Sequence, residues 1–391
     1  MKGWSDLVRD DRGDGSLTVV HLCAPAGVGG LERVVQGLTT GLDARGHRVT
    51  LMVVVSPGVD LTDLLAPVQR AGVRVVTIRS RGWIGTREMH EIRTVRRELA
   101  AIRPDVVHTH GYRSDLLHGW HLRCAGIAAV TTLHGSSRMG GLSHLFEYAQ
   151  LSALRHFDAV IAVSRPLYEK LQDEGVPGSR LHEIPNAWTP PTDPFDRETA
   201  RKALALEDSD DPVAIAWVGR LIPIKGCDVF LEALAEVRAD GWEVRIVGDG
   251  PERAALEAQA DRLGLRGRVQ FMGAIPDAAR YLAAFDLFVL SSRSEGTPMV
   301  LLEAMGAGLP AIATDVGGVP DVLPRPTDGW VVPSEAPHAL ARSIERVVRS
   351  AELRKERRSA SLIRVHQAFD FSEWVVRHEV TYRTAVAVRS S

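Results

Sequence analysis

The stretch from 286 to 315 constrains the fold of this chain more than any other. It opens with a short apolar run at 287–290 that ends in two serines, which is typical of a buried parallel strand. After a glycine-containing loop, Thr297 and Pro298 suit the N-cap and the first position of a helix. We expect that helix at 299–307, because glycine and proline follow it and a second apolar run begins. A strand–loop–helix–strand unit of this kind indicates an α/β sheet, whose ligands bind at the carboxyl ends of its strands.

The same alternation of short apolar runs and amphipathic segments fills most of the chain, which predicts the α/β fold class with parallel sheets. It is interrupted at 184–194, where four prolines and no periodicity indicate a boundary between domains. We therefore expect two Rossmann-like domains in tandem. The predicted divisions are a polar tail at 1–16, a first domain at 17–186, a linker at 187–212, a second domain at 213–365 and a final helix at 366–391 that could pack back on the first domain.

Composition excludes several classes of protein. With 47 basic and 49 acidic residues, the chain has no bulk attraction to nucleic acid. Cys23, Cys124 and Cys227 lie too far apart to indicate a zinc site or a disulfide framework. No apolar run approaches the ~20 residues that span a bilayer, and 1–16 lacks the apolar core of a signal peptide. We expect a cytoplasmic protein, and peripheral contact of the Arg-rich segment 87–97 with the inner face of the membrane stays open.

Two carboxylates flank the expected helix start, Glu295 in the loop and Glu303 in the second helical turn. The free backbone N–H groups at a helix N-terminus favour an anion such as phosphate. Carboxylates would repel that anion, so sugar hydroxyls are the better partners for them. The loop could therefore hold a phosphate, a ribose and a second sugar. The alternative is that both glutamates are simply solvated.

Three further glycine turns follow strands of the second domain. Gly219 and Arg220 end the strand at 214–218, and Lys225 follows five residues after Arg220. Two cations beside glycines suit a diphosphate, since arginine grips it with two hydrogen bonds and lysine acts as a point charge. The other turns contain Gly248 and the segment 271–273. Because parallel strands end at one edge of their sheet, all three turns should line that edge, unless the cations are ordinary surface residues.

At this point the motifs resemble a known family. The second half carries, in order, Val218-Gly-Arg-Leu with Lys225-Gly, Val247-Gly-Asp-Gly, Phe271-Met-Gly and the run from Ser294 to Pro310. The first half carries Gly29-Gly-Leu-Glu, His108-Thr-His-Gly, Thr132-Leu-His-Gly, Val163-Ser and Ile184-Pro-Asn. This order, over about 17–345, resembles the family 4 retaining glycosyltransferases (glycosyl transferases group 1). Their two domains face across a cleft in the GT-B fold. One departure is Ala187-Trp-Thr, where that family has Gly-Val-Asp.

The resemblance implies a role for each matching residue. Arg220 and Lys225 would neutralise the diphosphate of the donor, Glu295 would hold hydroxyls of the transferred sugar, and His134 would face that sugar. The implied donor-binding residues are Gly29, Gly30, Gly219, Gly248, Phe271, Met272, Gly273, Gly296, Thr297, Pro298, Met299 and Glu303. Among these, Glu303 would bond the ribose hydroxyls and 271–273 would receive the base.

The resemblance also implies a reaction. A sugar would move, with retention of configuration, from a UDP- or GDP-linked donor bound in the second domain to a hydroxyl acceptor bound in the first. The acceptor would be a glycan, a lipid-linked carrier or a small molecule, in cell-surface polysaccharide, exopolysaccharide, glycolipid or secondary-metabolite synthesis. No cofactor is implied. No metal is expected either, since no Asp-x-Asp pair ends a predicted strand. The oligomeric state stays open.

Two alternatives belong to other classes. One is a catalytically silent subunit that binds a nucleotide sugar on the same fold. The other is a dinucleotide-dependent dehydrogenase, disfavoured because 24–30 is not a G-x-G-x-x-G loop and no acidic residue ends the strand near Val55. The remaining histidines do not have the spacing of a clean metal site, and we expect them to be satisfied or at the surface. They include His108, His110, His118, His121 and His144.

Overall fold

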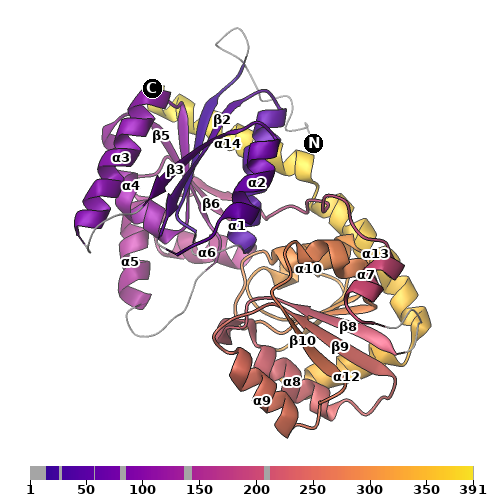
Figure 1. The fold of residues 1–391 in the computed structure, drawn as a ribbon. Coiled ribbons are helices and arrows are strands. Elements are labelled where there is room, and N and C mark those ends of the chain that lie inside the picture. Colours follow the sequence, from indigo (N-terminus) through magenta and orange to yellow (C-terminus); the bar gives the residue numbers. More distant parts are fainter. Residues whose placement is uncertain are drawn as a thin grey trace. The chain divides into compact units, whose positions relative to one another are not determined.

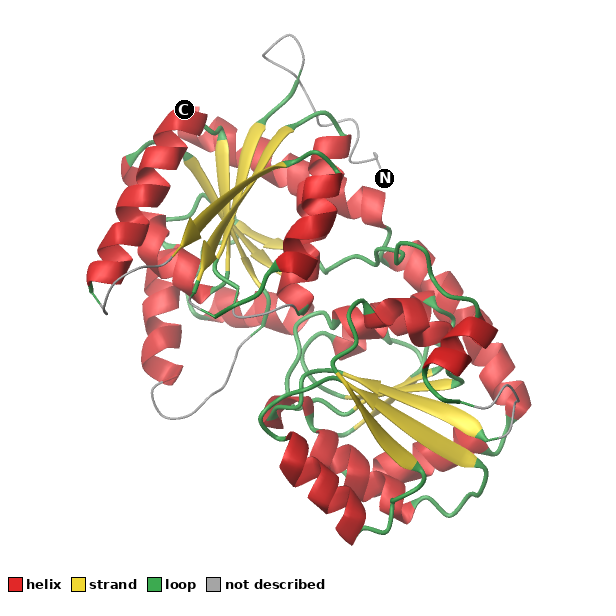
Figure 2. Cartoon of the chain, in the orientation of Figure 1, coloured by secondary structure: helices red, strands yellow, loops and turns green. Residues whose placement is uncertain are grey.

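The computed structural model describes residues 15–25, 29–56, 58–79, 85–135, 143–206 and 212–390. Its internal contacts divide the chain into two units. The first unit joins Met1–Asn186 with Phe371–Ser391, and the second is Ala187–Asp370. In each unit, helices cover the faces of a strongly twisted sheet (Figures 1 and 2).

The first unit is built on a seven-stranded sheet with the order β3-β2-β1-β4-β5-β6-β7. All neighbouring strands are parallel. The strands are β1 (Thr18–Cys23), β2 (Arg48–Val55), β3 (Arg74–Arg79), β4 (Val106–His110), β5 (Ala128–Leu133), β6 (Ala159–Ala162) and β7 (Leu181–Glu183). The helices are α1 (Gly30–Ala44), α2 (Thr62–Arg70), α3 (Thr86–Ile102), α4 (Tyr112–Cys124), α5 (Ser143–Leu154), α6 (Arg165–Asp173) and α14 (Phe371–Ser390). The strand order reverses between β1 and β4, the place where doubly wound sheets bind ligands.

The two faces of this sheet differ in character, because alternate residues of a strand point to opposite faces. Val20 and Val107 face an apolar core that contains Val95 of α3 and Leu122 of α4. The other face carries buried polar residues, and α14 packs against it over β4, β5 and β6. In Figure 1, α14 (yellow) joins the part of the molecule formed by the start of the chain.

The second unit is built on a six-stranded parallel sheet with the order β10-β9-β8-β11-β12-β13. The strands are β8 (Val213–Val218), β9 (Trp242–Val247), β10 (Val269–Gly273), β11 (Leu287–Leu290), β12 (Ala311–Thr314) and β13 (Trp330–Val332). The helices are α7 (Arg197–Ala203), η2 (Pro223–Lys225), α8 (Cys227–Glu236), α9 (Arg253–Arg262), η3 (Ala278–Ala284), α10 (Met299–Gly306), α11 (Val319–Val322), α12 (Pro337–Val348) and α13 (Ala351–Ala368). The expected α/β class with two Rossmann-like domains is confirmed.

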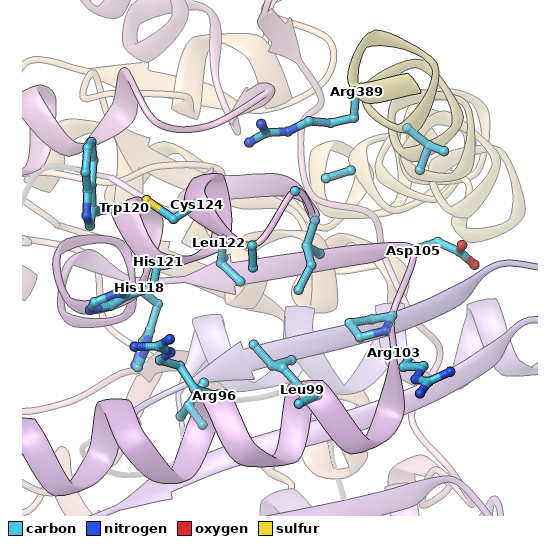
Figure 3. Close-up of a pocket in the computed structure, with 18 residues that line it drawn as sticks. Arg96, Leu99, Arg103, Asp105, His118, Trp120, His121, Leu122, Cys124 and Arg389 are labelled. Atoms are coloured by element: carbon cyan, nitrogen blue, oxygen red, sulfur yellow. The ribbon is translucent and has the colours of Figure 1, made fainter. Parts of the chain in front are cut away.

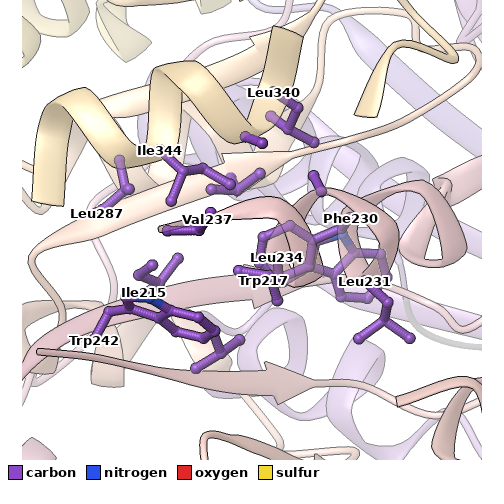
Figure 4. Close-up of a cluster of buried hydrophobic side chains, with 14 of the residues drawn as sticks. Ile215, Trp217, Phe230, Leu231, Leu234, Val237, Trp242, Leu287, Leu340 and Ile344 are labelled. Atoms are coloured by element: carbon purple, nitrogen blue, oxygen red, sulfur yellow. The ribbon is translucent and has the colours of Figure 1, made fainter. Parts of the chain in front are cut away.

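One large hydrophobic cluster holds α8 and α12 against the second sheet (Figure 4). Trp217 of β8 and Trp242 of β9 contribute its largest side chains, and both are almost fully buried. Phe230 of α8 and Ile344 of α12 close over them. This packing fixes the sheet from one side, so that the loops at the carboxyl ends of its strands start from a rigid frame.

The stretch 286–315 folds as a strand, a loop, a helix and a strand, as expected. One detail of the expectation is wrong: α10 begins at Met299, and Pro298 is its N-cap residue in an extended conformation (φ −72°, ψ 109°). The N-cap lies one residue later than Thr297, where we expected it. Farther back, the expected linker 187–212 contains α7, whose N-cap Asp196 accepts a hydrogen bond from the Thr199 N–H at 2.8 Å.

None of the described helices is both long enough and apolar enough to cross a membrane.

Candidate functional site

The three glycine turns of the second unit meet at the carboxyl edge of its sheet. The Gly219 N–H donates to the Val247 carbonyl at 3.0 Å, and the Gly248 N–H donates to the Gly273 carbonyl at 2.8 Å. Gly248 has a φ of +142°, and a Cβ atom there would lie 1.8 Å from the Gly219 carbonyl oxygen. The close approach of these turns therefore depends on glycine, and the structure brings them together as the strand order predicts.

Lys225 and Glu295 form an ion pair that their separation in sequence does not suggest. The Lys225 Nζ lies 2.7 Å from Glu295 Oε1, and the Ser292 hydroxyl donates to the same oxygen at 2.6 Å. The Glu295 side chain is only 8% exposed and that of Lys225 is 27% exposed. Lys225 is therefore not an isolated cation: it fixes the carboxylate of Glu295, whose other oxygen, Oε2, retains its capacity to accept hydrogen bonds.

Arg293, which the sequence analysis missed, holds the Glu295 loop against the Lys225 turn. Its guanidinium bonds both carboxylate oxygens of Asp228, at 2.8 and 2.7 Å, and also bonds Glu335. Its backbone N–H donates to the Ile224 carbonyl at 2.8 Å. Burial raises the pKa of Asp228, but hydrogen bonding to Arg293 and its charge outweigh that effect and leave the pKa lowered. A bidentate pair of this kind sets the position of a loop as well as its charge.

Arg220 and Glu303 occupy the places expected for ligand contacts. Arg220 is exposed at the end of β8, and within the described ranges its guanidinium has no hydrogen bond or ion pair. Glu303 lies half-buried on α10. At the start of that helix Gly296, Thr297, Pro298 and Met299 are buried, and the Gly296 carbonyl accepts from the Gly318 N–H at 2.9 Å. Phe271 and Met272 are half-buried at the end of β10.

A second residue that sequence reasoning missed is Arg253 of α9. Its guanidinium lies 3.3 Å from Asp249 and bonds the Phe271 carbonyl at 3.4 Å. It thus links the turn after β9 to the end of β10. The signal was weak, since an arginine four residues after Asp249 in a helical segment is normally a surface ion pair.

Two glycines with nearly the same backbone allow a test of how tightly the Lys225 turn is built. Gly226 (φ +63°) would place a Cβ atom 2.0 Å from the Ser291 carbonyl oxygen, whereas Gly264 (φ +73°) has nothing within 4 Å. Gly264→Ala should cost about 1–2 kcal/mol of unfolding free energy for the left-handed backbone alone. We expect Gly226→Ala to cost about 2 kcal/mol more, because backbone must move. Urea unfolding of both variants measures the difference, and equal losses would show that the turn gives way easily.

The remaining predicted residues belong to the first unit. Gly29 is the N-cap of α1 and has extended backbone, and Gly30 begins that helix. His134 directly follows β5, and burial lowers its pKa to about 4. The Nε2 atom of His134 lies 3.4 Å from the Nδ1 atom of His110. The structure therefore places the candidate residues in two groups, one in each unit, and their roles stay predictions.

The histidines of the first unit are arranged more closely than their spacing indicated. His108 is satisfied, as expected, by the Tyr382 hydroxyl at 2.6 Å and the Thr132 hydroxyl at 2.7 Å. His118 is buried 3.4 Å from Glu91, and His121 is half-buried. The side chain of His144 lies outside the described residues. The expectation of no clean metal set needs correction, because β1 and β4 bring ring nitrogens of His21, His108 and His110 within 4.8 Å of one another. The pairing of β1 with β4 produces this cluster, and no local spacing shows it.

A hollow of about 920 Å³ lies elsewhere in the first unit (Figure 3). Its walls come from α3, α4 and α14, with Arg96, Trp120, His121, Cys124 and Arg389 among the lining residues. It also includes the segments that precede β4 and β5, so it lies at the amino-terminal edge of the sheet. None of the predicted site residues lines it. Because ligands of doubly wound sheets bind at the opposite edge, we do not assign the donor to this hollow.

Comparison with protein families gives two matches in tandem. Residues 28–188 match the model for "Glycosyltransferase Family 4", and residues 212–350 match that for "Glycosyl transferases group 1". Together the two matches include every residue to which the resemblance gave a role at the donor site.

Curated relatives agree with these models. The chain is 33% identical over 255 residues to a subunit of the phosphatidylinositol N-acetylglucosaminyltransferase of Arabidopsis thaliana, which covers 62% of this chain and 54% of the relative. It is 30% identical over 243 residues to the lipopolysaccharide core biosynthesis glycosyltransferase LpsE of Rhizobium meliloti, covering 62% of this chain and 68% of the relative. The chain spans about half the length of the first of these relatives.

Solved structures show the same fold. Anabaena Alr3699/HepE in complex with UDP-glucose has a TM-score of 0.79 at 20% identity, covering 96% of this chain and all of that one. Sucrose-phosphate synthase from Thermosynechococcus elongatus has a TM-score of 0.80 at 22% identity, covering 95% of this chain and all of that one. At these identities the likeness concerns architecture alone. The family models and the LpsE relative add the sequence evidence, and the chain belongs to the family 4, group 1 glycosyltransferases of the GT-B fold.

Proposed function

We propose that this protein is a retaining glycosyltransferase that moves a sugar from a nucleotide-diphosphate sugar to a hydroxyl group of an acceptor. The observation that carries the proposal is the Lys225–Glu295 pair, held at the carboxyl edge of the second sheet beside the start of α10. One feature of this site suits a phosphate and another suits a sugar, and they lie on adjacent turns. Family membership supports the assignment.

The donor diphosphate is the leaving group, and negative charge builds on it as the glycosidic bond breaks. Arg220 and Lys225 supply positive charge to it, and the N–H groups at the start of α10 lie at the positive end of the helix dipole. Such groups stabilise the transition state more than the ground state, because the charge is greatest when the bond is nearly broken. Arg220 is exposed and free to turn towards a ligand, so it suits the grip on phosphate oxygens.

Glu295 suits the transferred sugar rather than the phosphate. Its Oε1 is occupied by Lys225 and Ser292, and its Oε2 can accept from a hydroxyl group. Because the loop is held by Arg293, the carboxylate is oriented before the sugar arrives, which lowers the entropy cost of binding. Glu303 on α10 has the corresponding role towards the ribose.

Retention is proposed by a front-face route in which an oxygen of the donor phosphate takes the proton of the acceptor hydroxyl. This route needs no carboxylate base from the protein. The cations supply the charge that a metal would otherwise supply, so we propose a reaction that needs neither a metal nor a cofactor. An assay in EDTA tests the first point, and the anomeric configuration of the product, read by NMR, tests retention.

UDP-linked and GDP-linked sugars are the proposed donors, and a glycan or lipid-linked intermediate of cell-surface polysaccharide or glycolipid synthesis is the proposed acceptor. The resemblance in fold to a protein solved with UDP-glucose and the relation to a lipopolysaccharide core transferase support these choices. Such acceptors are made at the inner face of the membrane, so the proposed location is the cytoplasm, with peripheral contact at that face.

Thermal unfolding with uridine, guanosine and adenosine diphosphates and their sugars, all in EDTA, tests the proposal directly. A nucleotide at 100 times its dissociation constant should add about 2.7 kcal/mol to the free energy of unfolding. We expect one nucleotide to raise the unfolding temperature, the effect to vanish in Lys225→Ala, and the exposed control Lys202→Ala to keep it. A shift with dinucleotides alone would contradict the proposal in favour of a dehydrogenase. Binding without transfer to any acceptor would favour the catalytically silent alternative.

A further inference from the structure

A layer of histidines lies between the first sheet and α14. His21 of β1, His110 of β4 and His134 after β5 come from three consecutive strands of the sheet. They share a face because the residues at alternate positions, Val20 and Val107 among them, face the apolar core on the other side. The ring of His108 lies against that of His110 with centroids 4.1 Å apart, and His378 of α14 lies over His108.

Three of these imidazoles form a chain of hydrogen bonds. His21 Nδ1 lies 3.0 Å from His110 Nε2, and His110 Nδ1 lies 3.4 Å from His134 Nε2. The two terminal nitrogens, His21 Nε2 and His134 Nδ1, are buried and have no hydrogen-bond partner among the described residues. Both nitrogens of His110 are therefore engaged, and one nitrogen remains at each end of the chain.

Each ring of the chain carries a single proton at neutral pH. Burial lowers the pKa of His21 to about 3 and that of His134 to about 4, and burial with the neighbouring histidines keeps the pKa of His110 well below its usual range. A neutral imidazole has one N–H donor and one acceptor nitrogen. The proton positions of the three rings are therefore coupled, since each hydrogen bond needs one donor and one acceptor.

Only two arrangements satisfy both hydrogen bonds. In the first, His21 donates from Nδ1 to His110, His110 donates from Nδ1 to His134, and His134 carries its proton on Nδ1. In the second, every proton is on the other nitrogen, so that His21 has its N–H on Nε2 and His134 has only a lone pair on Nδ1. The two arrangements differ in which end of the chain holds the unpartnered N–H group.

Burial favours the first arrangement. His21 is fully buried within the layer, where an unpartnered N–H group is rare and costly. His134 is part-exposed at the carboxyl end of β5, the edge at which ligands of such sheets bind. The first arrangement should therefore exceed the second by roughly fivefold to a hundredfold, the equivalent of about 1–3 kcal/mol.

We propose that His110, backed by His21, is a positioning residue that holds His134 as the Nδ1–H tautomer, so that His134 offers a hydrogen-bond donor to a polar oxygen of its ligand. That the ligand is the sugar donor rests on the proposed function, whereas the tautomer does not. His110 acts on the ligand only through His134.

A metal ion on His21, His108 and His110 is the competing use of the same layer. Both nitrogens of His108 are already hydrogen-bonded, to Tyr382 and Thr132, at 2.6 and 2.7 Å. An ion would have to displace one of these bonds as well as the bond between His21 and His110. The contacts thus favour the chain of hydrogen bonds.

The test is ¹⁵N NMR of the full chain labelled at histidine, without any ligand. Two-bond ¹H–¹⁵N correlations report which nitrogen of each ring is protonated, and His134→Gln identifies the signals of His134. We expect Nδ1 of His134 to be protonated in the unaltered protein. In His110→Leu the preference should fall at least fivefold, whereas His118→Gln, which removes an equally buried histidine bonded to Glu91, should leave it unchanged.

Three results would overturn the proposal. They are an Nε2–H tautomer of His134 in the unaltered protein, an unchanged tautomer in His110→Leu, and one transition-metal ion per purified chain that is lost in His21→Leu. The first and the third need no destabilised variant to be observed in a folded chain. Because no donor is present, failure of the glycosyltransferase assignment would leave these measurements unaffected, and the two failures can be told apart.

Discussion

Lowering the pH from 7 to 5 should destabilise the first unit by on the order of 5 kcal/mol. The cause is the histidine layer, whose members are buried as neutral rings. Burial lowers the pKa of His21 and of His378 to about 3, and that of His134 to about 4, from the usual 6.5. Each pKa unit corresponds to about 1.4 kcal/mol, so at pH 5 each of these rings favours the unfolded chain by about 2 kcal/mol.

The sign follows from proton binding. Below pH 6.5 the unfolded chain binds protons at these histidines and the folded chain does not, so stability falls as the pH falls, until the folded pKa values are reached. His108 and His110 act in the same direction, since their pKa values also lie well below the usual range. The contribution is fully present above pH 6.5.

Two carboxyl groups modify this profile. Burial raises the pKa of Asp115 to about 6, despite hydrogen bonds from Thr109 and Thr131, so this residue returns some stability as the pH falls below 6. Glu379 acts the other way at lower pH. Hydrogen bonding to His47 and to two arginines lowers its pKa to about 2, and that stabilisation is lost below about pH 4.5. One carboxyl group cannot offset several histidines, so the net loss between pH 7 and 5 stands.

Hydrogen exchange or calorimetry as a function of pH measures the effect, because either can separate the first unit from the second. The slope of stability against pH gives the number of protons taken up on unfolding, whatever the absolute stability of a variant. Between pH 6 and 4 that number should fall by about one in His378→Gln. It should hardly change in His90→Gln, which alters an exposed histidine. A first unit whose stability is flat between pH 7 and 5 would contradict the prediction.

The parts of this protein that sequence predicted well depend on local pattern and on the geometry of parallel sheets. Apolar runs such as 287–290 marked the strands, and glycine turns placed after strands had to meet at one edge of the sheet. The start of α10 was misplaced by one residue, because the same threonine–proline pair suits either of two adjacent cap positions.

What sequence did not predict are contacts between residues far apart in the chain. The hydrogen bond from Tyr382 to His108 joins residues 274 positions apart, and the Lys225–Glu295 pair spans 70. Arg293 and Asp228 are separated by 65. Such pairs depend on strand order and on the return of α14 to the first unit, which no single motif encodes. The residues that orient the candidate site were therefore the ones missed, while the residues expected to touch the ligand were found.

Lys225→Ala should lower the rate of sugar transfer by a hundredfold or more, on the order of 3 kcal/mol of transition-state stabilisation. Two losses combine in this variant. The diphosphate loses a cation when its charge is greatest, and Glu295, only 8% exposed, keeps its carboxylate with Ser292 as the remaining partner of Oε1. A buried carboxylate without its counter-ion is costly, so the loop is expected to move or the carboxyl group to take up a proton. In either case the group that should hold the sugar is displaced.

A double-mutant cycle separates these two losses. If Lys225 acts partly through Glu295, then Glu295→Gln should already remove part of the effect. The double variant should then lose clearly less activity than the product of the two single losses. Lys202→Ala, an exposed lysine of the same unit, controls for loss of a positive charge and should keep full turnover. Multiplicative losses would show two independent contacts with the donor. Near-normal turnover of Lys225→Ala would remove the lysine from the site, and with it the observation on which the proposed function rests.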